Sequence, residues 1–415
     1  MRRLHSVGEV LGILFISLLC GAWVIRGAEL GDMWPLDSEL VGDTVSRSFS
    51  VGGQFEAHAS YLVEEGVSDG FTFEIPRLNL GLSSGLSRTL RFAGELEFEP
   101  GGGELGLEKA LIEFEVDRSL TLRAGVFVVP IGGFNLDHGS PRYDFIRRPL
   151  VATEIIPGVL SDLGVGVSGS HELWGSTLAR GTSRISGAEG GGRLLYEIYL
   201  SNGLSTGIIL GAAERTRIAS GKGGERLAES PSGLPMLSAR VALESNRFGT
   251  LGLSRMGGVY NRRYLDGERI DRARRFEVWA FDQRAEVGPL SLVGEVAYAR
   301  IDVPESLREL YGERQWGAFI DLVLPLLEAP RSAGEDGWVF NAGLRLEYLD
   351  YNMGTFSSTG GSRGDEVISI TPALAFRPVP GTVFRLNYRR EWMWDRVRNP
   401  YEQVGGFQLG LATYF

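Results

Sequence analysis

The sequence predicts an all-β fold, a transmembrane antiparallel β-barrel of about 16 strands. From about residue 47 to its end, the chain repeats segments of roughly ten to fourteen residues in which apolar and polar positions alternate, as in a strand with two different faces. The connections between these segments alternate between short and long, which is typical of transmembrane barrels. Glycine is abundant (58 residues) and the mean hydropathy is −0.02, as expected for a wall with one face in lipid and one in water.

The alternation assigns each strand an inner and an outer face. In the first strand Gln54, Glu56 and His58 share one face, and the residues between them are apolar. A water-soluble sandwich would alternate in the same way, so the pattern of connections decides for the barrel. Two connections, 171–191 and 327–336, are longer than this pattern expects. The expected strands cover about residues 48–62, 71–82, 88–99, 106–117, 120–130, 162–170, 192–200, 236–246, 249–260, 274–287, 290–303, 314–326, 337–350, 365–378, 382–394 and 405–415.

The N-terminus predicts a bacterial secretory signal peptide. Arg2 and Arg3 precede a nearly uninterrupted apolar run, Val10 to Val24, and small residues follow it. An uncleaved membrane anchor is the alternative, but the run is short for a membrane span. The single cysteine, Cys20, lies in this segment, so we expect no disulfide in the mature chain. The expected organisation is a signal peptide at 1–28 with cleavage near 22 or 28, a periplasmic lead-in at 29–46, and the barrel at 47–415.

The last strand and the net charge indicate where the chain resides. Phe407, Leu409, Leu411 and the terminal Phe415 share one face, and this segment resembles the C-terminal strand by which outer-membrane proteins are delivered to the barrel-assembly machinery. The formal net charge of −10 argues against nucleic acid as a partner, because phosphate binding needs a basic patch. We therefore expect a bacterial outer-membrane protein, in contact with outer-membrane lipid and lipopolysaccharide and with the barrel-assembly machinery.

One connection, residues 131–161, is too long and too apolar to be an ordinary loop. Loops of this length in compact folds are usually functional or disordered, and this one carries several large apolar side chains. We expect it to fold into the barrel and narrow the bore, so that its charges meet permeating solutes. The alternative is a solvated external loop whose charges pair with one another. The expected constriction residues are Arg142, Arg147, Arg148, Asp137, Asp144 and Glu154.

The segments around this connection resemble those of Gram-negative porins of the phosphate-selective (O and P) type. The resemblance rests on RAGVFVVPIG at 123–132, FIRRP at 145–149, DLGVGV at 162–167 and YEIYLSNG at 196–203. It covers about residues 88–203 and implies a channel of sixteen strands, commonly a homotrimer, with its third external loop folded into the pore. It does not extend to phosphate specificity, which would call for a denser set of basic residues along the pore.

The alternation also places charged side chains along the lumen. Acidic residues on two neighbouring strands would face basic residues across the bore and create a transverse field. The alternative is that a cross-strand partner neutralises each charge. The expected pore-lining residues are Glu95, Glu97, Glu113, Glu115, Arg123, Arg345, Arg385 and Arg389.

These features favour a porin that allows passive diffusion of small hydrophilic solutes or ions. A non-conducting barrel that serves as an adhesin or structural anchor is the alternative. Asp137, His138 and Ser140 include the residue types of a catalytic triad, but triads are assembled from separated positions, so their adjacency is not an argument for catalysis. We expect no enzymatic activity, no cofactor and no metal site.

Overall fold

The computed structural model describes residues 49–68, 70–99, 104–174, 191–210, 215–223, 227–329 and 337–415. In this part of the chain, sixteen antiparallel strands follow one another around a closed barrel, and the last strand pairs with the first. The predicted fold class is confirmed. The predicted signal peptide (1–28) and lead-in (29–46) lie outside the described residues.

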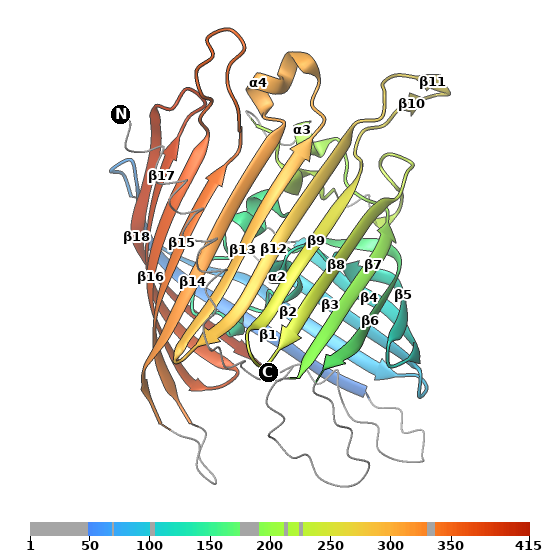
Figure 1. The fold of residues 1–415 in the computed structure, drawn as a ribbon. Helices are drawn as coiled ribbons and strands as arrows, with labels where there is room; N and C mark the ends of the chain where they lie inside the picture. The colour runs from blue at the N-terminus through green and yellow to red at the C-terminus, as the bar shows by residue number, and fades with distance from the viewer. Residues whose placement is uncertain are drawn as a thin grey trace.

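The wall strands are tilted and lie side by side in chain order (Figure 1). They are β1 (Phe49–Glu64), β2 (Phe71–Gly85), β3 (Leu90–Glu99), β4 (Glu104–Asp117), β5 (Leu120–Val128), β6 (Ser161–Trp174), β7 (Gly192–Ser201), β8 (Met236–Ser245), β9 (Gly249–Val259), β12 (Arg275–Val287), β13 (Leu290–Ile301), β14 (Arg314–Glu328), β15 (Val339–Asp350), β16 (Glu366–Val379), β17 (Thr382–Trp394) and β18 (Pro400–Tyr414).

Every predicted strand is present, and the differences lie at the ends. β6 continues to Trp174, so it takes up the first part of the overlong connection 171–191, of which 175–190 lie outside the described residues. β18 begins at Pro400, five residues before the predicted start at 405, because its first residues extend the pairing with β17. A short external hairpin, β10 (Tyr264–Leu265) with β11 (Glu268–Arg269), was not predicted.

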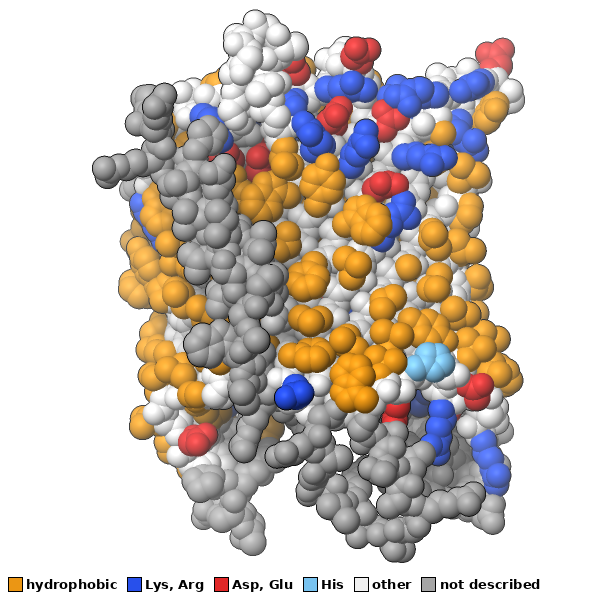
Figure 2. Space-filling model, in the orientation of Figure 1, with side chains coloured by type: hydrophobic (Ala, Val, Ile, Leu, Met, Phe, Trp, Pro, Cys, Tyr) orange, Lys and Arg blue, Asp and Glu red, His pale blue; other side chains and the backbone are white. Residues whose placement is uncertain are grey.

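The outer face of the wall carries a band of apolar side chains between two charged rims (Figure 2). In β12, for example, Trp279 is 44% exposed on the outside, whereas Phe276 and Val278 are buried inside. Large apolar side chains exposed over a whole wall would be costly in water, but they match the hydrocarbon of a bilayer. No helix in the described part of the chain is long and apolar enough to cross a membrane.

The connections divide between the two ends of the barrel. Turns such as 118–119, 288–289 and 380–381 lie at the end where the C-terminus is found (Figure 1). Connections 129–160, 202–235, 260–274, 302–313 and 351–365 lie at the other end, which in transmembrane barrels faces the exterior. Short helices occur in these long connections: α2 (Gly133–Leu136), η1 (Ser140–Arg142), the π-helical η2 (Val151–Ile155), α3 (Gly207–Leu210), η3 (Ile218–Gly221), η5 (Glu305–Leu307) and α4 (Arg308–Tyr311).

The connection 129–160 turns into the barrel, where α2 is visible behind the front strands (Figure 1). We call this segment the inner loop. Its apolar side chains and those of connection 202–235 pack on the inner faces of β9 and β12–β16. This cluster explains the apolar part of those inner faces, while polar residues of the same faces, such as Glu295 and Glu347, hydrogen-bond to the inner loop. Its fully buried members include Val129, Ile131, Val151, Ala152, Ile155, Ile156, Leu160, Ile208, Ile218, Met256, Val278, Ala297, Ala299 and Leu349.

Candidate pore constriction

The inner loop is fixed at its entry by wall side chains that accept its backbone N–H groups. Gly132 donates to Ser254 Oγ on β9 at 2.9 Å, and Phe134 donates to Glu295 Oε2 on β13 at 3.0 Å. Asn135 then ties the two ends of the loop together: its Nδ2 donates to the carbonyl of Val129, and its Oδ1 accepts the N–H of Leu160. Because buried backbone groups need partners, these bonds allow an irregular segment to lie inside the barrel.

Gly132 is the point at which the chain turns inward, and we expect Gly132→Ala to destabilise the barrel by about 1–3 kcal/mol. Its φ is +69°, and an added Cβ would lie 2.6 Å from Glu295 Oε1. The free energy of unfolding, from urea titration of protein folded in lipid vesicles, measures the loss. Gly233→Ala is the control, since Gly233 has a φ of +68° but open space around it. Equal losses for the two variants would contradict a steric role for Gly132.

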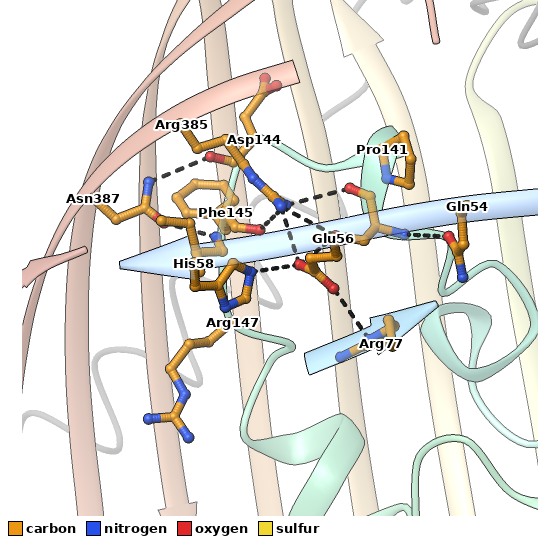
Figure 3. A network of polar contacts seen from close by, with 12 residues as sticks. Gln54, Glu56, His58, Arg77, Pro141, Asp144, Phe145, Arg147, Arg385 and Asn387 are labelled. Atoms are coloured by element: carbon orange, nitrogen blue, oxygen red, sulfur yellow. Dashed lines mark hydrogen bonds and ion pairs between the residues drawn. The ribbon is translucent and has the colours of Figure 1, made fainter. Parts of the chain in front are cut away.

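The middle of the inner loop is held by the buried carboxylate of Glu56 on β1, which is 1% exposed (Figure 3). Its Oε1 accepts a hydrogen bond from Ser140 Oγ at 2.5 Å and an ion pair from Arg385 Nη2 at 3.0 Å. Arg385 also donates Nη1 to the carbonyl of Phe145 at 2.9 Å, and Arg77 pairs with Oε2 of Glu56 at 3.1 Å. One buried acid on β1 thus connects β2, β17 and its own strand to the loop.

A second set of anchors comes from β15–β17. Asp144 is buried and pairs with Arg377 Nη2 at 2.6 Å, and Asn341 Nδ2 donates to its other oxygen at 2.9 Å. The backbone N–H groups of Ile146 and Leu150 donate to Asn387 Oδ1 at 2.7 Å and to Glu347 Oε1 at 2.6 Å. Asp144 therefore attaches the loop to the wall and does not face an open bore.

Arg345 on β15 is also a loop anchor. It pairs with Asp321, its register partner on β14, through two contacts of 2.6 Å, and Nη1 donates to the carbonyl of Arg147. The guanidinium lies 4.4 Å from the ring centre of Phe145 and 5.5 Å from that of Phe319. The predicted pore-lining role of Arg345 and Arg385 is corrected: both face inward, but they are 2% and 3% exposed because the loop covers them.

Asp137, at the turn of the inner loop, forms ion pairs with two arginines. Its two carboxylate oxygens accept Arg142 Nη1 and, from β12, Arg284 Nη1, each at 2.6 Å. Burial would raise the pKa of Asp137, but the two guanidiniums outweigh it and hold that pKa below its ordinary value. Arg142 and Asp137 are half-buried and neutralise each other. At the far end of the loop, Glu154 pairs with Arg217 of connection 202–235 at 2.7 Å.

In the part of the chain that the structure describes, Arg147 and Arg148 are the loop cations that form no ion pair with a carboxylate. Arg147 is exposed to the lumen. Nε and Nη2 of Arg148 are buried and form no hydrogen bond within the described part of the chain. Burial, together with repulsion from Arg77, lowers the pKa of Arg148 to about 10, so the side chain stays cationic at neutral pH. With Arg389, which pairs with Glu391, they line a small hollow of about 20 Å³ against β15–β18.

Acidic side chains lie on β3 and β4, and the side-chain amide of Asn79 on β2 contacts three of them. Asn79 Nδ2 lies 3.1 Å from Glu95, 3.2 Å from Glu97 and 2.9 Å from Glu108. The inward position of Glu108 was not predicted. A β-bulge at this residue adds one residue to β4 and shifts the inward and outward positions that follow it. Leu107 and Ile112 therefore both point outward, although they are five residues apart and regular alternation would place them on opposite faces. The sequence signal for this bulge was the adjacent pair of charged residues Glu108 and Lys109, which interrupts the alternation of polar and apolar positions.

The other predicted lining residues are placed on the inner face of the wall. Arg123 on β5 pairs with Glu113 at 2.7 Å and with Glu197 on β7 at 2.9 Å, and Nη1 donates to Tyr199 Oη at 2.6 Å. Glu115 lies one inward position below Glu113 on β4 and is half-exposed. Cross-strand pairing therefore neutralises much of the wall, which was the alternative to opposed charged walls.

Two features bear on chemistry other than transport. His138 is 6% exposed; its Nε2 lies 2.5 Å from Glu108 and its Nδ1 lies 2.8 Å from the carbonyl of Asn135. Both ring nitrogens are thus used to fix the loop. Among the described residues, no group of three or more His, Cys, Asp or Glu side chains is arranged to hold a metal ion.

Comparison with known proteins shows the fold. No family model matches the sequence. The chain is 22% identical over 375 residues to an uncharacterized protein of Aquifex aeolicus (strain VF5), an alignment that spans 86% of this chain and 78% of that protein. Similar solved structures include the anion-selective porin of Comamonas acidovorans (12% identity, TM-score 0.53, 89% of this chain and 100% of that chain) and OmpF of Salmonella typhi (11%, 0.52, 89% and 98%).

The closed barrel of sixteen strands with an inner loop is thus the porin fold. Together with the apolar outer band, it places the protein in the bacterial outer membrane. The narrower resemblance to the phosphate-selective porins is not confirmed by these comparisons and stays a prediction, as does the homotrimer.

Proposed function

We propose that this protein is a passive diffusion channel for small hydrophilic solutes or ions, with Arg147 and Arg148 at its constriction. The observation that carries the proposal is that, within the described residues, these two cations of the inner loop form no ion pair, whereas the other expected charges of the loop are paired. Unneutralised charges in a narrow bore act strongly on passing ions.

The burial of the inner faces supports a bore on one side of the loop. On β12–β17 the inner side chains are almost all buried beneath the loops, including Asp321, Glu347 and Asn387. On β3–β5 most inner charges are half-exposed, although Glu108 is buried. The proposed aqueous path therefore runs between the inner loop and the β2–β7 part of the wall. Half-exposed side chains that fit this path are Glu95, Glu97, Glu113, Glu115 and Arg123.

The charges along this path favour a general sieve. The basic side is formed by Arg147 and Arg148, and the acidic side by Glu95, which pairs with Lys109, and Glu97, whose charge interacts with that of Arg148. A field of this kind orients dipolar solutes and admits both signs of ion. It gives no specific support for phosphate.

Planar lipid bilayers test the proposal directly. Purified, folded protein should produce stepwise increases in current, each of them an inserted channel. Heat-modifiable migration on gels verifies that the barrel is folded in the same sample. A folded barrel that inserts and yet carries no current would overturn the proposed function.

A non-conducting barrel is the second candidate, and one observation favours it. Connection 202–235 also enters the interior: Leu204, Ile208 and Ile218 are fully buried against the inner loop, and Thr216 accepts a hydrogen bond from Gln315 on β14. If these segments close the lumen, removal of residues 206–223 should create current where the intact protein has none. If the intact protein already conducts, this candidate is eliminated.

A further inference from the structure

Two arginines on the outer face of the external rim lie directly opposite each other. Arg300 on β13 and Arg314 on β14 are register partners, and both are exposed. Their chain neighbours Ala299 and Gln315 are buried inside the barrel, so the two guanidinium groups point away from the lumen. Figure 2 shows the basic side chains that gather on this rim above the apolar band.

The barrel does not neutralise this pair. Glu277 on β12 is the register partner of Arg300, but its carboxylate accepts Arg255 Nη2 at 2.5 Å instead. Within the described residues, neither the Arg300 nor the Arg314 guanidinium makes a hydrogen bond or an ion pair. Like charges directly opposite each other destabilise a sheet. An external anion would remove that repulsion.

The depth of the pair in the membrane follows from the aromatic row beneath it. Trp279, Tyr298 and Trp316 are register partners on β12, β13 and β14, all on the outer face and two positions from the charged row. Tryptophan and tyrosine mark the boundary between hydrocarbon and headgroups. Arg300 and Arg314 consequently lie at headgroup depth in the outer leaflet.

We propose that this rim is a binding site for a phosphorylated lipid headgroup of the outer leaflet. A phosphate oxygen shared by the Arg300 and Arg314 guanidiniums would cancel their repulsion, and arginine suits phosphate because its planar fork donates two hydrogen bonds. The acyl chains would lie along the Trp279–Tyr298–Trp316 row. The proposal depends on the orientation of the barrel in the membrane and not on whether it conducts.

Native mass spectrometry of the intact protein in detergent, with added diphosphoryl lipid A, tests the site. Arg300→Gln/Arg314→Gln should bind this lipid roughly 10- to 30-fold more weakly than the unaltered protein. Arg300→Lys/Arg314→Lys should retain part of the binding, because charge remains and the bidentate geometry is lost. Heat-modifiable migration checks that each variant is folded.

The matched control is Arg118→Gln/Arg247→Gln, which removes two exposed arginines from the short turns at the opposite rim. This variant should bind lipid A as the unaltered protein does. Equal binding by Arg300→Gln/Arg314→Gln, equal binding of a phosphate-free glycolipid with the same acyl chains, or full displacement by millimolar inorganic phosphate would each overturn the proposal.

Discussion

In a salt gradient, Arg147→Glu/Arg148→Glu is expected to shift ion selectivity of the channel toward cations, by roughly tenfold in the permeability ratio. Arg147 is exposed to the lumen, and within the described residues neither side chain forms an ion pair with a carboxylate. Replacing two positive charges with two negative ones in a narrow lumen inverts the local potential. The reversal potential across a planar bilayer measures the effect, and Arg147→Gln/Arg148→Gln should give an intermediate value.

The control for this experiment reverses two arginines that lie outside the lumen. Arg262 and Arg269 are exposed in the external connection that carries β10 and β11. Arg262→Glu/Arg269→Glu should leave the reversal potential close to that of the unaltered protein, because salt screens exposed charges beyond about 10 Å. An unchanged reversal potential in Arg147→Glu/Arg148→Glu, or an equal shift in the control, would contradict the position of the constriction.

Arg345→Met is expected to be the most destabilising single substitution among the anchors, with a loss of about 3–5 kcal/mol in the free energy of unfolding. Arg345 and Asp321 are each 2% exposed and contact each other twice at 2.6 Å. Removing the guanidinium leaves a buried carboxylate without its counter-ion and releases the carbonyl of Arg147. Urea titration of the barrel in lipid vesicles, followed by tryptophan fluorescence, gives the value.

The double variant Asp321→Leu/Arg345→Met separates lost charge pairing from lost packing. Replacing both members of a buried pair by apolar groups is often neutral, so the double variant should recover most of the stability. Its open-channel current should nevertheless be noisier, since the loop has lost the bond to Arg147. A loss below about 1 kcal/mol in Arg345→Met would contradict the anchoring role.

The strands could be predicted because their period of two is local and repeated. Positions such as Gln54 and Glu56 fall inward in the structure, as the alternation indicates. The bulge at Glu108 escaped prediction because one extra residue inverts the alternation for the rest of the strand. The resulting contact of Glu108 with His138 joins residues far apart in the sequence.

The candidate site was predicted less well, for a different physical reason. Alternation assigns a side chain to the inner face, but it does not say what covers that face. Arg345 and Arg385 are inward, yet they hold the inner loop. The same limit applies to Asp144, whose partners Arg377 and Asn341 come from β16 and β15. Whether a charged side chain anchors the loop or faces the lumen, as Arg147 and Arg148 do, depends on the path of the loop through the barrel. Alternation of polar and apolar residues does not predict that path.

The most direct test of the central claim is chemical modification of a cysteine at position 147 during current recording. In a background with Cys20→Ser, Arg147→Cys provides the single reactive thiol of the chain. A bulky thiol reagent added to an open channel should lower its conductance, and a positively and a negatively charged reagent should shift selectivity in opposite directions. Complete modification with unchanged conductance and selectivity would contradict a constriction formed by the inner loop.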